Sequence, residues 1–185
     1  MKRKRNQKVY NALTQDLSDY LIKAGWFENS RYDDNTPIAG IAAVQNYGAT
    51  INQTVTPKQR AFLHYLGIHL KKSTEGLTIV IPPTHFMENC QSKNKQKWRN
   101  IIKNAWTSVF LGNITADKAI EQLGMLIEGD IAKEIADGNY PPDKPTTVER
   151  KLSKYKNKKT SGNLDKRLIG QGIMLDAVSH QVEKL

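Results

Sequence analysis

Apolar residues recur at three- and four-residue steps along much of the chain, which is the spacing of amphipathic helices. The pattern predicts helices over residues 8–24, 36–47, 58–70, 86–111 and 115–137. Thr36, Thr56 and Thr115 are expected N-caps, and a proline follows the first two. Gly67 is expected to shorten the third helix. The second helix is small and apolar on nearly every side, so we expect it to be deeply buried.

Shorter alternating stretches predict strands. They cover residues 25–28, 50–55 and 77–81, and a helical turn followed by a strand within 168–182. Pro82 and Pro83 end the third strand, since proline has no donor for a strand ladder. Helices and strands do not alternate strictly. We therefore predict an α+β fold, with a small mixed or antiparallel sheet packed by several helices, in a single domain of 185 residues.

Charge changes this picture at two places. The formal net charge is +10, which favours a nucleic acid or an acidic protein surface as a partner, although a solvated lysine-rich surface gives the same balance. We expect a basic N-terminal arm at 1–7 and an extended basic loop region at 140–167. The candidate electrostatic contacts to a partner or DNA are Lys2, Arg3, Lys4, Arg5, Arg150, Lys151, Lys154, Lys156, Lys158 and Lys159.

The sequence contains few motifs that indicate catalysis or the binding of a metal or cofactor. No phosphate-binding glycine loop or nucleophile elbow occurs, and the single cysteine, Cys90, is expected to serve packing. His64 and His69 are five apart on one expected helix, so we expect them not to share a face. The sequence thus predicts no catalytic residue, no metal and no cofactor. A small nuclease or peptidase whose site is assembled across the fold stays open. No apolar run is long enough to span a membrane, so we expect a soluble protein without membrane contact.

Four blocks, in order, resemble the tail-completion or neck proteins of tailed phages, also called virion morphogenesis or minor tail component proteins. The blocks are GWFENSRYDDNTPIAGIAAVQNYGA, VTPKQRAFLHYLGIHLKK, IVIPPTHFM and LDKRLIGQGIMLDAVSHQV. His85–Phe86 lacks the proline usual in that family, and Gly170-Gln171-Gly172 stands in place of Asp-Thr-Gly. The assembly or core motif residues that the resemblance marks are Tyr47, Gly48, Ile81, Pro82, Pro83, Phe86, Met87, Gly170, Gly172 and Leu175.

The resemblance implies a structural virion protein with no catalysis. Such a subunit forms a six-fold or twelve-fold ring that joins head and tail and surrounds the DNA channel. Its partners would be portal or connector-side proteins, and tail tube or tail terminator proteins, with transient DNA contact. It would lie at the head–tail junction or tail end, and in the host cytoplasm before assembly. The alternatives are a tail terminator and a basic nucleic-acid-binding module.

Overall fold

The computed structural model describes residues 19–155 and 166–185. The expected basic arm at 1–7, the first part of the expected helix 8–24 and residues 156–165 lie outside this range. The described elements, in chain order, are β1 (Tyr20–Gly25), α2 (Ile38–Tyr47), β2 (Ala49–Thr54), α3 (Pro57–Tyr65), β3 (Gly76–Ile81), α4 (Phe86–Phe110), α5 (Ala116–Asp137), α6 (Pro145–Tyr155), α7 (Ile173–Asp176) and β4 (Ser179–Lys184).

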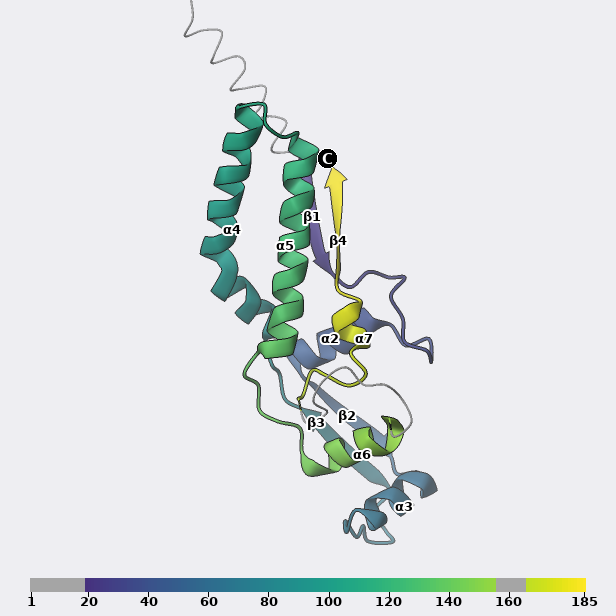
Figure 1. The fold of residues 1–185 in the computed structure, drawn as a ribbon. Coiled ribbons are helices and arrows are strands. Elements are labelled where there is room, and N and C mark those ends of the chain that lie inside the picture. The colour runs from purple at the N-terminus through teal and green to yellow at the C-terminus, as the bar shows by residue number, and fades with distance from the viewer. Residues whose placement is uncertain (1–18, 156–165) are drawn as a thin grey trace, which may run out of the picture.

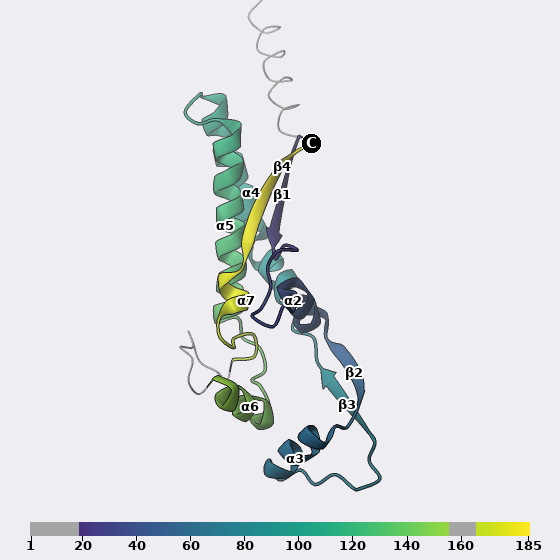
Figure 2. The same ribbon diagram turned by 90° about the vertical axis from the view of Figure 1, so that its right-hand side faces the viewer.

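The predicted α+β class is confirmed, but the strands form two separate sheets. β1 pairs antiparallel with β4, and β2 pairs antiparallel with β3. We call the first pair the terminal ribbon. We call residues 49–81, which hold β2, α3 and β3, the hairpin extension. Figure 1 shows α4 on one side of α5 and the terminal ribbon on the other side. In Figure 2 the hairpin extension leaves the molecule below α2 and projects away from the other elements.

The core lies where α2, α4, α5 and α7 meet. Phe86 has no exposed surface, and its ring meets that of Trp26 edge to face with centroids 5.8 Å apart. The indole Nε1 of Trp26 donates to the carbonyl of Met174 at 2.7 Å. The buried cluster consists of Ile38, Ala42, Phe86, Cys90, Ile131, Ile135, Leu168, Met174 and Val178. These residues come from the middle and the end of the chain, so the core closes only when both have been brought together.

Strand β1 replaces the end of the helix predicted over 8–24. Residues 20–24 alternate between half-buried and exposed positions, and their apolar members also fit a helical spacing. The strand is favoured over the helix because β4, about 160 positions later, supplies a hydrogen-bonding partner for each residue of β1. The pairing runs from Tyr20↔Lys184 to Gly25↔Ser179. The strand predicted at 25–28 is wrong for the same reason, since the ladder ends at Gly25.

Two further expectations are corrected. Helix α2 begins at Ile38 with Pro37 as its N-cap, and Thr36 makes no capping bond. Only Ile38, Ala42 and Asn46 of this helix are buried, so one face packs rather than the whole helix. The region 140–167 is not simply an extended loop, because α6 occupies Pro145–Tyr155.

Several local predictions are confirmed. Thr56 forms a capping box with Gln59, and Thr115 caps α5 through Lys118 N–H. Helix α3 ends at Tyr65, before Gly67, where the backbone takes a positive φ of 76°. Strand β3 ends directly before Pro82. The chain ends with the short helix and strand expected for the tail.

Candidate assembly surfaces

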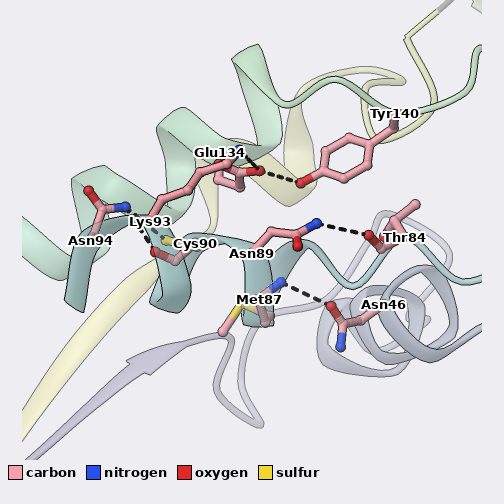
Figure 3. A network of polar contacts seen from close by, with 9 residues as sticks. All are labelled: Asn46, Thr84, Met87, Asn89, Cys90, Lys93, Asn94, Glu134 and Tyr140. Atoms are coloured by element: carbon pink, nitrogen blue, oxygen red, sulfur yellow. Dashed lines mark hydrogen bonds and ion pairs between the residues drawn. The ribbon is translucent and has the colours of Figure 1, made fainter.

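The hairpin extension joins the molecule at a hydrogen-bonded junction between the end of α2 and the start of α4 (Figure 3). The N-cap residue of α4, His85, has a left-handed backbone with no side-chain cap. Buried Asn46 takes over this role, because its Oδ1 accepts from Met87 N–H at 3.0 Å. Its Nδ2 donates to Glu88 at 2.9 and 3.1 Å. One side chain of α2 therefore satisfies a free donor in the first turn of α4.

The backbone at the same junction is tightly packed. The N–H and hydroxyl of Thr84 both donate to the carbonyl of Gln45, at 3.1 and 2.7 Å. Gly48 has a positive φ of 78°, and a Cβ there would lie 2.7 Å from the carbonyl oxygen of Ile81. The same atom would lie 2.9 Å from the nitrogen of Pro83. Only glycine fits this position, and the close approach sets how the hairpin extension leaves α2 and α4.

The two strands of the hairpin extension have one polar and one apolar face. Residues directly opposite each other in an antiparallel pair lie on the same face. Thr50↔Val80 and Asn52↔Thr78 define an exposed face, across which the Thr78 hydroxyl donates to Asn52 at 2.7 Å. The other face consists of Ala49, Ile51, Gln53, Leu77, Ile79 and Ile81. None of these six residues is buried, and Ile51 is 42% exposed.

Exposed apolar side chains are numerous in the described residues. Eleven large hydrophobic residues are exposed, against thirteen buried hydrophobic ones. Those outside the hairpin strands lie at the far tip of the α4–α5 hairpin, on α3, at the end of α2 and elsewhere: Leu21, Tyr47, Tyr65, Ile68, Phe110, Leu111, Met125, Leu152 and Leu185. Isolated exposed hydrophobics are ordinary, but an apolar strand face on which every residue is half-buried or exposed is a candidate interaction surface.

The second surface is an apolar groove of about 350 Å³ between β1, α4 and α5. Its lining is Ile22, Ala24, Met87, Glu88, Cys90, Gln91, Trp98, Ile127 and Ile131. Burial raises the pKa of the Cys90 thiol, so this residue stays protonated and contributes as a small apolar group. The groove lies beside the edge of β1, which pairs with β4 alone among the strands that the structure describes.

Charged pairs hold α4 against α5 beside this groove. Lys93 binds the buried carboxylate of Glu134 at 2.7 Å, and Lys97 binds that of Asp130 at 2.6 Å. Trp98 Nε1 also donates to Asp130 at 2.7 Å. Each buried carboxylate thus has a cation and a second donor, as burial of a charge requires. The second donor to Glu134 is the Tyr140 hydroxyl at 2.6 Å, and burial, followed by this hydrogen bond, raises the pKa of Tyr140.

The terminal ribbon is fixed to α5 by a histidine. Nδ1 of His180 lies 2.6 Å from Glu128, and Nε2 lies 3.2 Å from Glu121. The hydrogen bond to Glu128 raises the pKa of His180 against the opposing effect of burial. The ring also lies over Gly124, where a Cβ would be 2.2 Å from His180 Cδ2. The backbone of α5 and the ribbon therefore meet as closely as their atoms allow.

The predicted motif residues fall into three groups. Gly48, Ile81, Pro82 and Pro83 meet at the base of the hairpin extension, and Arg167 donates to the Pro82 carbonyl there. Phe86 is in the core, Met87 lines the groove, and Leu175 packs on the core near buried Gly172. Gly170 lies in the loop before α7. Tyr47 stands apart from the core, 67% exposed.

The predicted basic contacts are only partly described. Lys2, Arg3, Lys4, Arg5, Lys156, Lys158 and Lys159 lie outside the described residues, and Lys154 lies within α6. Arg150 is exposed. Lys151 is not available as an electrostatic contact, because its ammonium binds Asp143 at 2.6 Å and the carbonyls of Lys166 and Ile169. The two hydrogen bonds to these carbonyls tie α6 to the loop before α7, a role that the sequence did not indicate.

Sequence reasoning also missed the side-chain pair His64 and His69. Their Nδ1 atoms lie 2.8 Å apart, although the two positions were expected on different faces of one helix. The expectation fails because α3 ends between them.

Within the described ranges, no three His, Cys, Asp or Glu side chains gather as a metal site, and no helix has the length and apolarity to cross a membrane. Comparison with protein-family models, curated proteins and solved structures finds no match for this chain.

Proposed function

We propose that this chain is a ring-forming structural subunit of a tailed-phage neck or tail-completion assembly, in which the hairpin extension is the main contact between neighbouring copies. The sequence blocks that resemble that family include both sides of the junction, around Tyr47–Gly48 and Ile81–Phe86. The partners that follow from the proposal are portal-side and tail-side proteins, and the location is the virion.

The apolar face of β2 and β3 carries the proposal. Five of its six residues are apolar, and all six are half-buried or exposed. The two strands project away from β1, β4, α4 and α5 (Figure 2). An isolated two-stranded hairpin is marginally stable in water. Covering this face with a neighbouring copy would remove apolar area from water at about 25 cal/mol per Å².

Ring closure requires two different patches on each subunit. The hairpin extension supplies one patch, and the groove beside β1 is a candidate for the other, since its lining comes from β1, α4 and α5 and not from the hairpin extension. Both are apolar, so their burial against one another would suit a permanent assembly. The close packing at Gly48 and Asn46 would fix the angle between the patches and thereby the number of subunits.

The test compares two faces of the same strands. We expect the purified chain to form rings by electron microscopy and mass measurement. Replacing Ile51 and Ile79 together by serine should shift the mass to that of a monomer, with the circular dichroism spectrum unchanged. The matched control, Thr50→Ser with Thr78→Ser on the exposed face, should leave rings intact. A wild-type chain that stays monomeric at all concentrations, and that is absent from particles, contradicts the proposal.

A second candidate function, binding of nucleic acid, is favoured by the net charge of +10 and by exposed Arg150. This reading predicts that the monomeric Ile51→Ser, Ile79→Ser variant is retained on DNA, with an affinity that falls steeply as salt rises. The ring proposal needs no such retention. Electrostatic docking of the ring to acidic partners should also weaken with salt, whereas contact through the apolar hairpin face should not.

A further inference from the structure

The two histidines of the hairpin extension converge at its tip. Helix α3 ends at Tyr65, yet the Nδ1 atoms of His64 and His69 lie 2.8 Å apart. The ring centroids are 4.6 Å apart, with an angle of 68° between the ring planes. Both side chains are exposed. Two imidazole nitrogens thus lie side by side in a place that a dissolved ion can reach.

The turn after α3 builds this arrangement. Gly67, with its positive φ of 76°, donates its N–H to the His64 carbonyl at 2.9 Å. Ile68 N–H donates to Leu63 at 2.8 Å, which folds the chain back along the last turn of the helix. Arg60 holds the next segment, because its guanidinium donates to the carbonyls of Lys71 at 2.9 Å and Thr74 at 2.6 Å. The backbone on both sides of His69 is therefore held in place.

The spacing of the nitrogens matches that of two ligands on one cation. Imidazole nitrogens that bind a metal at about 2.0–2.1 Å and at right angles to each other lie about 2.9 Å apart. A tetrahedral angle would need about 3.4 Å. The observed 2.8 Å fits the right-angled case, which is the arrangement that Cu²⁺ and Ni²⁺ prefer with nitrogen ligands.

We propose that His64 and His69 form a two-ligand site for Cu²⁺ or Ni²⁺ at the tip of the hairpin extension, with water in the remaining positions. Without metal, the short contact is a hydrogen bond in which one neutral ring donates from Nδ1 to the other. On binding, that ring carries its hydrogen on Nε2 instead, so both Nδ1 lone pairs face the ion and no proton is lost.

The position on the helix supports a cation independently of the distance. The pair lies at the C-terminal end of α3, which is the negative end of the helix dipole. A positive ion gains from this field, whereas an anion would be repelled. The site does not depend on the ring proposal, because both ligands belong to one chain.

The experiment is titration of the full chain, without an affinity tag, with CuCl₂ and NiCl₂ near neutral pH. We expect one site that binds Cu²⁺ more tightly than Ni²⁺, following the general order of divalent metals. His64→Gln and His69→Gln should each weaken binding on the order of tenfold or more, the scale that even outer ligands reach. With Cu²⁺ bound, electron paramagnetic resonance should show coupling to two nitrogens in the wild type and to fewer in each variant.

The matched control is His85→Asn. His85 is also exposed, and asparagine tolerates its left-handed backbone, with φ of 53°. This variant should bind as the wild type does. Circular dichroism shows whether the two glutamine variants fold. Absence of binding by the wild type, or binding that neither His64→Gln nor His69→Gln reduces, overturns the site and leaves a hydrogen-bonded pair only.

Discussion

The terminal ribbon and the strands of the hairpin extension are alike in length and pairing but differ in what lies beneath them. Each has two antiparallel strands of six residues. The inner face of the ribbon packs on α5, where His180 binds Glu128 and Tyr20 donates to Asp117 at 2.5 Å. Among the described residues, no helix makes a comparable contact with β2 or β3, and Ile51 on their apolar face is 42% exposed. Two pairs of strands with the same backbone geometry can therefore differ in role. One pair packs on a helix within the molecule, and the other presents an apolar face that a partner could cover.

The difference also appears in how each pair is connected. The ribbon joins two segments about 160 residues apart, so its two strands are brought together only by the tertiary fold. The hairpin extension closes locally, through α3 and a turn held by Arg60. The local hairpin does not need the core to form its ladder, which is consistent with its projecting position (Figure 2).

The largest expected contrast comes from the same substitution on each side of the junction. Ile131→Ala, in α5 beside the ribbon, removes a side chain that is 3% exposed and should lower the free energy of unfolding by about 2–5 kcal/mol. Ile51→Ala, on the hairpin extension, should cost the monomer less than about 1 kcal/mol, since its side chain is already 42% exposed. Urea denaturation of both variants measures this, and equal losses would show that the hairpin face is packed after all.

A smaller effect is expected where the ribbon touches the backbone of α5. Gly124→Ala places a methyl group 2.2 Å from His180 Cδ2 and should destabilise the chain by about 1–3 kcal/mol through overpacking. Gly129→Ala on the same helix meets open space, so it should stabilise by about 0.5–1 kcal/mol, the difference in helix propensity. If thermal unfolding gave both variants the same shift, the close contact between ribbon and helix would be refuted.

The ribbon should also respond to pH. Because Glu128 raises the pKa of folded His180 above its ordinary value of 6.5, the protonated ring stabilises the folded chain. This contribution is complete below pH 6.5 and disappears as the pH rises through the higher folded pKa. We expect the difference in unfolding free energy between wild type and His180→Gln to shrink between about pH 6 and pH 9. A difference that stays constant over this range would mean that the histidine acts by packing alone.

The smallest changes in the free energy of unfolding are expected for substitutions on the outer faces of the terminal ribbon and of the hairpin strands. Lys23 and Glu183 form an exposed ion pair across the ribbon at 2.6 Å. Lys23→Gln should cost less than about 1 kcal/mol, and the loss should fade in high salt. Thr78→Val, which removes the exposed bond to Asn52, should be similarly small in urea denaturation. Large effects here would mean that these faces, too, contribute to the core.

Features that depend on neighbouring residues were predictable. The Thr56 and Thr115 caps, the end of β3 before Pro82 and the long helices α4 and α5 all follow from local patterns. Lys93 and Lys97, with Asp130 and Glu134, share a four-residue spacing that could have revealed the α4–α5 pairing. The candidate assembly surfaces were predictable only at the junction, where glycine and proline mark constrained backbone.

Features that depend on distant residues were not predictable. The strand β1 needed a partner from the end of the chain, and Lys151 needed the loop before α7. The contact between His64 and His69 depends on where α3 ends. If the helix had continued for five more residues, the two side chains would have pointed to different faces. In each case the local pattern was compatible with more than one outcome, and a contact outside that pattern decided between them.

The sequence by itself determined the α+β class, most helix boundaries and the backbone constraints at Gly48, Pro82 and Pro83, because caps, turns and hydrophobic period act over a few residues. The tertiary structure alone decided that the strands form two sheets, that only one of them packs on α5, and that the other leaves its apolar face half-buried or exposed. Burial depends on which elements meet in space, and this depends on contacts between residues far apart in the chain.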